Sequence, residues 1–356
     1  MIDPFGRTID YLRISVTDRC NFRCVYCMPE DGVAFAPREE LLTFEEIARL
    51  VAIFVRLGIS KIRLTGGEPL VRKELHRLVA DIAALPGVRD LSLTTNGLLL
   101  GRHAGALAQA RLHRVNVSLD TLRPERFAAI CRGGDLGTVL NGIRAARDAG
   151  LAPIKLNVVS MRGVNDDEAP DFAAWTLREE VHVRFIELMP IRWNLDEVGG
   201  FEPEAAFGGE RGLIRIRQGD GGMLSDGQMR RMTISSAELR SHIEETHGQL
   251  APAELATNGP ARTYRLSGAP GTVGFISQIS NDLCSHCNRL RLTSDGFLRP
   301  CLMADGELSL RDSMREGAPD ERLEELILHV VAHKPERHYL AEGQRVTARS
   351  MSQIGG

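Results

Sequence analysis

The sequence predicts an α/β fold in which six strand–helix units form a partial (βα)6 barrel, followed by a C-terminal α+β extension. Six short β-rich runs occur in the first half of the chain, and stretches with apolar residues three and four apart lie between them. Such alternation favours a parallel sheet, and right-handed crossovers curl the units toward a barrel. The functional site is then expected in the loops at the carboxyl ends of the strands.

The elements follow in order along the chain. The predicted strands are LRISV (12–16), IRLTG (62–66), LSLTT (91–95), VNVSL (115–119), IKLNVV (154–159) and VRFIEL (183–188). Helices are predicted over 43–58, 72–85 and 137–150, and the first ends at Gly58, a residue type that commonly terminates helices.

A glycine- and charge-rich stretch then interrupts the pattern. We expect a partial barrel over residues 1–195, an inserted flexible segment over 196–234, and a C-terminal domain over 235–356. Within the inserted segment, LIRIR (213–217) is consistent with a short strand.

Composition excludes several classes of protein. The chain has 356 residues, of which 43% are hydrophobic, enough for a sizeable core. Its formal net charge of −3 gives no general reason to bind nucleic acid or an anionic membrane. The sequence contains no apolar run of about 18 residues, the length that predicts a membrane span. Without a signal-like N-terminal segment, we expect a cytoplasmic protein.

Seven cysteines in a reducing compartment are more often ligands or packing residues than disulfides. Six of them form two groups of three: Cys20, Cys24 and Cys27 at spacing C-x3-C-x2-C, and Cys284, Cys287 and Cys301 at spacing C-x2-C-x13-C. Cys131 is the seventh, and we expect it to be a small, buried apolar residue.

Three thiolates suit an iron–sulfur cubane in which one iron stays open for chemistry, whereas a closed zinc site needs four ligands. The first group follows the first strand, and TGGEP (65–69) follows the second, so both lie on the loop face. Paired glycines there would let the backbone approach a ligand, although a simple turn is the alternative. For the second group, a zinc site completed by Asp282, His286 or Asp295 remains open.

Several basic residues lie on the predicted strands. In NRLRL, Arg289 and Arg291 share one side of an extended segment, and Asn288 and Leu290 share the other. Arg13, Arg63 and Lys155 could converge on the same barrel mouth, because an unpaired charge facing the lumen is costly.

The two motifs C-x3-C-x2-C and GGEP resemble the radical S-adenosylmethionine (SAM) superfamily. Within it, LRISVTDRCNFRCVYCMP, KIRLTGGEPLVRKEL, VNVSLDTL, RFIELMP, CSHCNRLRLTSDGFLRPCL and the terminal GG resemble the GTP 3′,8-cyclase family of molybdenum cofactor biosynthesis. This resemblance covers nearly the whole chain.

The resemblance implies a TIM-like partial barrel and a lyase that converts GTP to (8S)-3′,8-cyclo-7,8-dihydroguanosine 5′-triphosphate. It implies two 4Fe–4S clusters: the first group of cysteines would hold the one that binds SAM, and the second group one that contacts the guanine of GTP. The implied partners are GTP, an external low-potential electron donor and a downstream pterin synthase, with no stable nucleic acid or membrane partner, in a monomer or homodimer.

The resemblance also assigns site residues. SAM would contact Tyr26, Gly67, Ser118 and Met189. GTP would contact Arg13, Arg63, Thr94, Lys155, Arg289, Leu290 through its backbone, and Arg291. The diglycine end, Gly355 and Gly356, would enter the active site and take part in catalysis, where a frayed tail is the alternative. Two other functions remain open: a radical enzyme with an auxiliary cluster that acts on a peptide or RNA, and a non-catalytic zinc-binding module.

Overall fold

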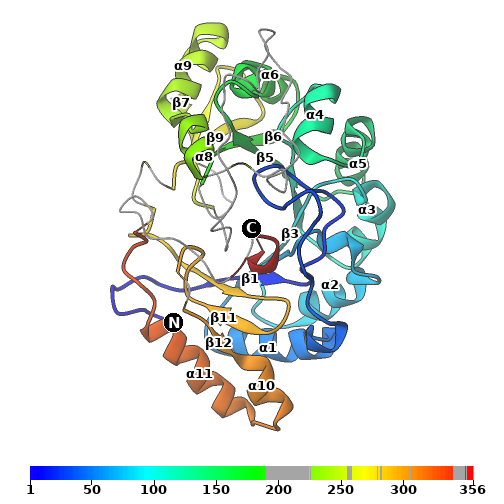
Figure 1. The fold of residues 1–356 in the computed structure, drawn as a ribbon, viewed down its shortest axis with the longest axis vertical. Coiled ribbons are helices and arrows are strands. Elements are labelled where there is room, and N and C mark those ends of the chain that lie inside the picture. Colours follow the sequence, from blue (N-terminus) through cyan, green and yellow to red (C-terminus); the bar gives the residue numbers. More distant parts are fainter. Residues whose placement is uncertain are drawn as a thin grey trace.

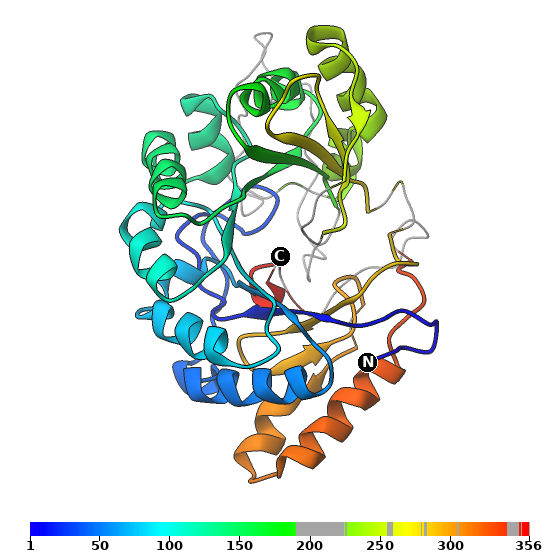
Figure 2. The same cartoon turned by 180° about the vertical axis from the view of Figure 1, so that it is seen from behind.

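A single curved sheet forms the frame of the molecule, with helices along its outer side (Figures 1 and 2). The computed structural model describes residues 1–189, 224, 226–254, 259–278, 280, 283–304, 306–339, 349 and 351–355. In these residues the sheet has twelve strands in the order β12-β11-β10-β1-β2-β3-β4-β5-β6-β9-β8-β7. The sheet does not close on itself in this order, so it is an open, partial barrel.

The six predicted strands are all present, within two residues at each end, and form the parallel centre of the sheet. They are β1 (Tyr11–Ser15), β2 (Lys61–Thr65), β3 (Asp90–Thr95), β4 (Arg114–Ser118), β5 (Ile154–Ser160) and β6 (Val181–Glu187). The predicted (βα)6 order is therefore confirmed.

Helices connect these strands, and the sequence contains residues that favour the start and the end of a helix. They are α1 (Phe44–Arg56), α2 (Leu75–Ala84), α3 (Leu100–Gln109), α4 (Pro124–Cys131), α5 (Leu136–Asp148) and α6 (Ala169–Arg178). Thr43 and Glu46 form a capping box at the start of α1, which satisfies amide groups that the helix itself cannot bond. Gly58 follows the end of α1 with φ +99°, a conformation that glycine adopts without strain.

The C-terminal part extends both edges of the sheet rather than forming a separate layer. It contains α8 (Asp226–Met232), α9 (Ser236–His247), β7 (Ala251–Pro252), β8 (Arg262–Arg265), β9 (Thr272–Ile276), β10 (Arg289–Leu292), β11 (Phe297–Arg299), β12 (Leu308–Ser309), α10 (Leu310–Arg315), α11 (Asp320–Ala332) and α12 (Met351–Ile354). Strand β10 pairs in parallel with β1, and β9 pairs in parallel with β6. The second cysteine group therefore lies next to β10, the strand that pairs with β1, and β1 directly precedes the first cysteine group.

The segment expected to be inserted and flexible, 196–234, lies mostly outside the described residues, and LIRIR lies wholly outside them. Within its described part, residues 226–232 form α8, and the side chain of Met229 is completely buried. The three domain boundaries remain predictions.

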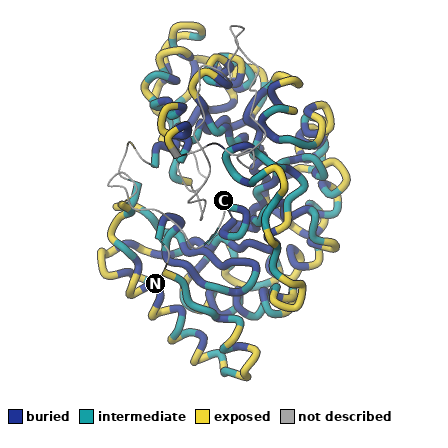
Figure 3. Tube along the Cα trace, in the orientation of Figure 1, coloured by how far each residue is buried: buried dark blue, intermediate teal, exposed yellow. Residues whose placement is uncertain are grey.

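The two faces of the central strands have different roles. Leu12, Ile14, Ile62 and Leu64 are completely buried in the core between the sheet and the helices. The alternate residues point to the inner side of the curve, where the short helix α12 lies near the carboxyl ends of the strands (Figure 1). Burial is greatest along the strands and least on the outer helices (Figure 3). Among the described helices, none combines the length and apolarity that a membrane crossing requires.

Candidate active site

A cavity of about 240 Å³ lies inside the curve of the sheet. Residues that end or follow β2, β3, β4, β5 and β6 contribute to its wall, so it occupies the loop face that the strand order predicts. All three cysteines of the first group line it. We call Cys20, Cys24 and Cys27 the first triad, and Cys284, Cys287 and Cys301 the second triad.

The loop of the first triad packs closely on the glycine pair that follows β2. A Cβ atom on Gly67 would lie 2.4 Å from the carbonyl oxygen of Arg19, a distance that no side chain could tolerate. The amide of Gly67 also donates to the carbonyl oxygen of Thr17 at 2.8 Å. Glycine is therefore required here for close packing of the two loops, and not only for a turn.

Glu68 joins three loops beneath the first triad. Its buried carboxylate accepts hydrogen bonds from the Thr95 hydroxyl at 2.7 Å and from the Asn96 amide at 2.6 Å. The Asn96 side chain in turn donates to Asn21 in the cysteine loop at 2.8 Å. Burial raises the pKa of Glu68 to about 7, although these hydrogen bonds oppose the shift. The carboxylate therefore acts as a structural link between the loops after β1, β2 and β3.

The thiols of the first triad are shielded from water. Burial raises the pKa of Cys20 to about 12, and burial together with the neighbouring Cys24 raises that of Cys27. In the metal-free protein these thiols stay protonated at neutral pH. Metal ligation requires thiolates, so cluster assembly must release their protons.

Tyr26 is fixed by a residue that the sequence did not single out. Its hydroxyl donates to Asp120 Oδ2 at 2.7 Å, and Asp120 Oδ1 accepts from the Val159 amide at 2.8 Å. Burial raises the pKa of Asp120 to about 6, partly offset by the Tyr26 hydrogen bond. Tyr26 is thereby held at the cavity wall next to the first triad.

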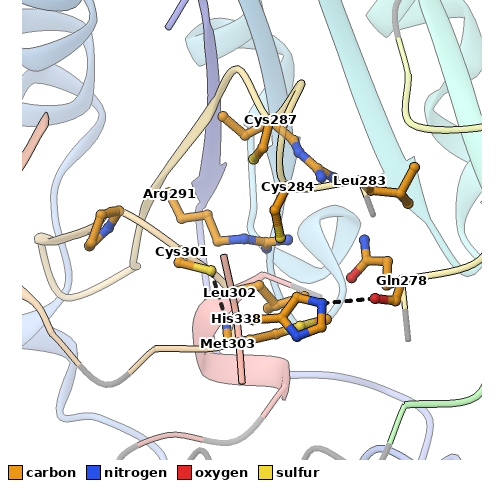
Figure 4. A pocket seen from close by; sticks show the side chains of 11 residues that line it. Gln278, Leu283, Cys284, Cys287, Arg291, Cys301, Leu302, Met303 and His338 are labelled. Atoms are coloured by element: carbon orange, nitrogen blue, oxygen red, sulfur yellow. Dashed lines mark hydrogen bonds between the residues drawn. The ribbon is translucent and has the colours of Figure 1, made fainter. Parts of the chain in front are cut away.

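The second triad lines an adjoining cavity of about 40 Å³, and Figure 4 shows the Arg291 side chain among its cysteines. The two cavities share Gln278, Arg289, Arg291 and Leu302, so they are neighbours with a common wall. Burial acts to raise the pKa of Cys287, but Arg289 and Lys334 outweigh it and lower the pKa to about 6. This thiol is therefore ready to bind metal as a thiolate at neutral pH.

The wall of the main cavity carries a row of arginines. Arg13 in β1 pairs in register with Arg63 in β2 and with Arg291 in β10, and all three line the main cavity. Burial and the neighbouring Arg289 lower the pKa of Arg291 to about 9, while burial and Arg291 lower that of Arg13. Because the like charges of these buried guanidinium groups repel one another, the row is a candidate site for an anionic ligand.

The tail reaches this arginine row. Arg291 Nη1 donates to the carbonyl oxygen of Gly355 at 2.7 Å, and Gly355 adopts φ +67°. A Cβ atom at Gly355 would lie 2.2 Å from Thr65 Oγ1, at the end of β2. Residues Met351 and Ser352 line the main cavity. Gly356 lies outside the described residues.

Most predicted site residues meet at the main cavity. Its wall includes Cys20, Cys24, Cys27, Arg13, Tyr26, Arg63, Gly67, Thr94, Ser118, Met189, Arg289 and Arg291. Thr94 Oγ1 is buried and has no hydrogen-bond partner among the described residues, so a ligand could use it.

Of the predicted GTP contacts, two are not at the wall of the main cavity. Lys155 is buried behind it beside Arg184, and Leu290 points into the core, with its backbone in register with Leu12. The sequence leaves three residues open as the fourth ligand of an alternative zinc site. Asp295 pairs with Arg349 at 2.8 Å, His286 bonds to Ser285, and Asp282 lies outside the described residues.

Arg184 is a wall residue that sequence reasoning missed. It is 4% exposed, and its Nη2 donates to Asn116 at 2.8 Å and to Asn157 at 2.6 Å. The signal was present, because an arginine stands between the apolar residues Val183 and Phe185 in the strand VRFIEL. Asp120 gave no comparable signal, since its role depends on contacts with residues far away in the sequence.

The chain matches two sequence profiles. Residues 14–176 match the one described as "Radical SAM superfamily", and residues 222–340 match the one described as "Molybdenum Cofactor Synthesis C". The two matches fall on the two halves of the chain that carry the first and second triads.

Curated relatives align with the chain from end to end. Proteins named GTP 3′,8-cyclase from Pelotomaculum thermopropionicum, Moorella thermoacetica and Heliobacterium modesticaldum are 48%, 47% and 49% identical to it, with 100% of each chain covered. Identity at this level over the full length establishes the family.

Solved structures give weaker likenesses. The crystal structure of a methylornithine synthase has a TM-score of 0.41 at 17% identity, over 51% of this chain and 54% of that one. A radical SAM methyltransferase from Sphaerobacter thermophilus has a TM-score of 0.44 at 17% identity, over 73% and 64%. Neither likeness adds to the assignment.

Proposed function

The chain belongs to the GTP 3′,8-cyclase family of the radical SAM superfamily, and from this premise we propose which of its residues perform the reaction. It is a radical SAM cyclase of molybdenum cofactor biosynthesis, and it uses two 4Fe–4S clusters and SAM. One observation supports the residue assignments above all: two cysteine triads flank a buried row of arginines. A radical enzyme that acts on a peptide or RNA would also hold two clusters, but the full-length relatives named GTP 3′,8-cyclase favour GTP as the substrate.

The first triad holds the cluster that binds SAM. Three half-buried thiols line the cavity, and no fourth cysteine lies in the loop, so Cys20, Cys24 and Cys27 would hold a 4Fe–4S cluster and leave it open to SAM. When bound, the cluster and SAM together supply the carbon-centred radical that removes a hydrogen atom from C3′ of GTP. Gly67, Ser118 and Met189 line the pocket beside the triad, and Tyr26, fixed by Asp120, contacts the adenine.

The arginine row holds the triphosphate of GTP. A nucleoside triphosphate carries close to four negative charges, and Arg13, Arg63 and Arg291 present three guanidinium groups on adjacent strands. Guanidinium forks bind phosphate oxygens bidentately, so they fix the orientation of the substrate as well as its charge. Thr94 Oγ1, which has no partner among the described residues, supplies a hydroxyl contact. Lys155 adds charge from behind the wall, and the backbone of Leu290 contributes with Arg289.

The second triad holds the cluster that recognises guanine. Arg289 serves this triad as well as GTP, because its guanidinium stabilises the Cys287 thiolate. Since the two cavities share Arg289 and Arg291, one GTP molecule can contact the second cluster with its base and the arginine row with its phosphates. The ribose then lies between the triads, where C3′ faces the SAM pocket.

The tail closes the substrate pocket. Gly355 contacts Thr65 and accepts a hydrogen bond from Arg291, so the end of the chain lies between the arginine row and the loop after β2. We assign Gly355 and Gly356 to the catalytic step because a backbone without side chains can approach the ribose closely.

The product is (8S)-3′,8-cyclo-7,8-dihydroguanosine 5′-triphosphate, and a downstream pterin synthase takes it up. An external low-potential donor reduces the clusters. We place the protein in the cytoplasm, because free thiols that ligate clusters require a reducing compartment.

Anaerobic turnover tests the proposal. The reconstituted protein is incubated with GTP, SAM and dithionite, and chromatography measures 5′-deoxyadenosine, remaining GTP and the cyclised product. Iron analysis should find about eight irons per chain, the content of two cubanes. If 5′-deoxyadenosine forms no faster with GTP than without it, GTP is the wrong substrate. A colourless protein that contains zinc would refute the cluster assignments.

A further inference from the structure

Cys131, the cysteine outside both triads, lies against the loop of the first triad. It is the last residue of α4 and is only 4% exposed. The Arg23 amide donates to the carbonyl oxygen of Cys131 at 2.9 Å, and the Val25 amide donates to that of Ile130 at 3.0 Å. Cys24 stands between these two donors, so the backbone holds it beside Cys131.

Side-chain packing makes this pairing rigid. The rings of Phe22 and Phe127 meet edge to face, with their centres 5.8 Å apart. On the other side, a Cβ atom on Gly133 would lie 3.1 Å from the carbonyl oxygen of Asn21. The end of α4 therefore contacts the triad loop at three successive points, and Cys131 has little freedom to move away from Cys24.

The two side chains are neighbours in the fold. Cys131 and burial together raise the pKa of Cys24, and the backbone hydrogen bonds on either side of Cys24 place it against the end of α4. When Cys24 loses its proton to bind iron, its sulfur can only accept. The Cys131 side chain, which is not one of the triad ligands, is the S–H group placed to donate to it.

A hydrogen bond to a ligand sulfur changes the electronic properties of an iron–sulfur cluster. It stabilises the extra negative charge of the reduced state, and reduction potentials of clusters depend on such bonds. We propose that Cys131 is a positioning residue whose thiol donates a hydrogen bond to the Cys24 sulfur and raises the reduction potential of the first cluster. The inference rests on the proposed function, in which the first triad holds that cluster.

Potentiometric titration followed by EPR tests the inference. The signal of the first cluster is identified by its change when SAM is added, and the second cluster is the internal control. Cys131→Ala and Cys131→Val remove the donor at two side-chain volumes, and both should shift the midpoint of the first cluster to a more negative value. Cys131→Ser restores a stronger donor and should keep the midpoint at or above that of the unchanged protein.

Each other outcome has a defined meaning. An unchanged midpoint in the Ala and Val variants would show that Cys131 is only a packing residue and would overturn the inference. Loss of the first cluster from all three variants would also overturn it, because the residue would then act on assembly. If the unchanged protein has no SAM-sensitive signal and about four irons, the proposed function itself fails.

A cross-link in cluster-free protein checks the contact independently. Diamide takes up the two protons and two electrons that two thiols lose when they form a disulfide. Trypsin places Cys24 in peptide 24–38 and Cys131 in peptide 127–132, while Cys20 is separated in peptide 20–23. Mass spectrometry should find 24–38 joined to 127–132 through Cys24, and this species should be lost in Cys131→Ser. Exclusive formation of a Cys24–Cys27 disulfide would contradict the contact.

Discussion

Arg291 in β10 donates a hydrogen bond of 2.7 Å to the carbonyl oxygen of Gly355, 64 residues later in the chain. The same Nη1 group bonds to the carbonyl oxygen of Ile354 at 3.2 Å. One end of the guanidinium fork therefore holds the tail. Among the described residues, the Nε and Nη2 groups of Arg291 make no hydrogen bond, so they can bind the GTP that we propose as ligand. Arg291 thus connects the position of the tail with the binding of substrate.

The first prediction concerns Gly355. Gly355→Ala places a methyl group where Thr65 Oγ1 now lies and strains a positive φ, so the tail must shift. We expect product formation to fall by about 100-fold, the cost of a displacement near 1 Å at a reacting centre. Iron content and GTP affinity should stay nearly unchanged, and deletion of Gly355 and Gly356 should abolish product.

Gly248→Ala is the matched control. Gly248 has φ +84° and no atom near its Cβ position, so this change carries the backbone strain without any contact to the site. Its turnover should be normal. Normal turnover in the protein that lacks Gly355 and Gly356 would show that the tail has no catalytic role.

The second prediction concerns GTP binding by Arg289 and Arg291. Replacing either with Ala should weaken GTP binding by about 10- to 100-fold, since a hydrogen bond to a charged group contributes about 1.5–3 kcal/mol. Lysine should restore only part of the affinity, because an ammonium cannot bind phosphate bidentately. Equilibrium dialysis measures the affinity, with Arg322→Ala at the exposed Arg322–Glu325 pair as the control. Unchanged affinity in the double Ala variant would remove both arginines from the site.

The sequence predicted the parts of this molecule that depend on local pattern. The strand LSLTT is found at Asp90–Thr95, because alternating apolar residues specify a buried strand wherever it pairs. The alternation in NRLRL also holds: Arg289 and Arg291 line the cavity, while Leu290 is fully buried. Cysteine spacing identified both triads because the proposed cluster ligands of each triad lie close together in the sequence.

Long-range contacts could not be predicted in this way. Nothing in TVGFI or NRLRL shows that β9 pairs with β6 and β10 with β1, because strand order depends on the whole sheet. Cys131 was correctly expected to be buried, but its contact with Cys24 depends on how α4 ends against a loop more than a hundred residues earlier. Asp120 was missed because its partner, Tyr26, is 94 positions away.

The third prediction is a pH dependence caused by Lys155. Burial, together with Arg184 and Arg114, lowers its pKa to about 6 from an ordinary 10.5. The side chain is therefore neutral in the ligand-free protein above pH 6, and bound triphosphate should raise the pKa again. GTP binding should then take up a proton between pH 6 and 10, and affinity should fall as pH rises, by up to about tenfold per pH unit.

Calorimetry in two buffers of different ionisation enthalpy measures this proton uptake. Lys155→Met should abolish it and flatten the pH dependence. Lys61→Met, which removes a lysine paired with Asp10 at the other end of the strands, should leave it intact. Equal proton uptake in the Lys155→Met variant would assign the effect to another group.

The lowered pKa of Lys155 makes the stability of the ligand-free protein rise with pH, whereas GTP affinity falls with pH. The folded protein binds fewer protons at Lys155 than the unfolded chain does between pH 6 and 10.5, so this group makes the ligand-free protein more stable as pH rises through that range. Denaturant titrations of the unchanged protein and Lys155→Met should diverge most at the low end of this range.

The last prediction concerns the anchor of the tail. Arg349 lies two residues before α12, and its guanidinium binds Glu307 at 2.8 Å and Asp295 at 2.8 Å while it covers the ring of Phe297 at 4.8 Å. Its side chain is only 13% exposed, so these pairs are poorly screened. Arg349→Ala leaves the carboxylate of Asp295 without this partner, whereas Glu307 keeps its ion pair with Arg299, and the change should release the tail. Turnover should fall by at least about tenfold, because the tail then loses its fixed geometry, while GTP affinity should change little.

Hydrogen exchange in the C-terminal peptide should become faster in Arg349→Ala. The exchange rate in Arg349→Lys should lie between those of the unchanged protein and Arg349→Ala, because lysine keeps the positive charge but cannot bind both carboxylates as the guanidinium does. If Arg349 acts only through the tail, Arg349→Ala should have no further effect on turnover in a protein that already lacks Gly355 and Gly356. Normal turnover and unchanged exchange in Arg349→Ala would show that contacts within the cavity, such as the Arg291–Gly355 hydrogen bond, are enough to hold the tail.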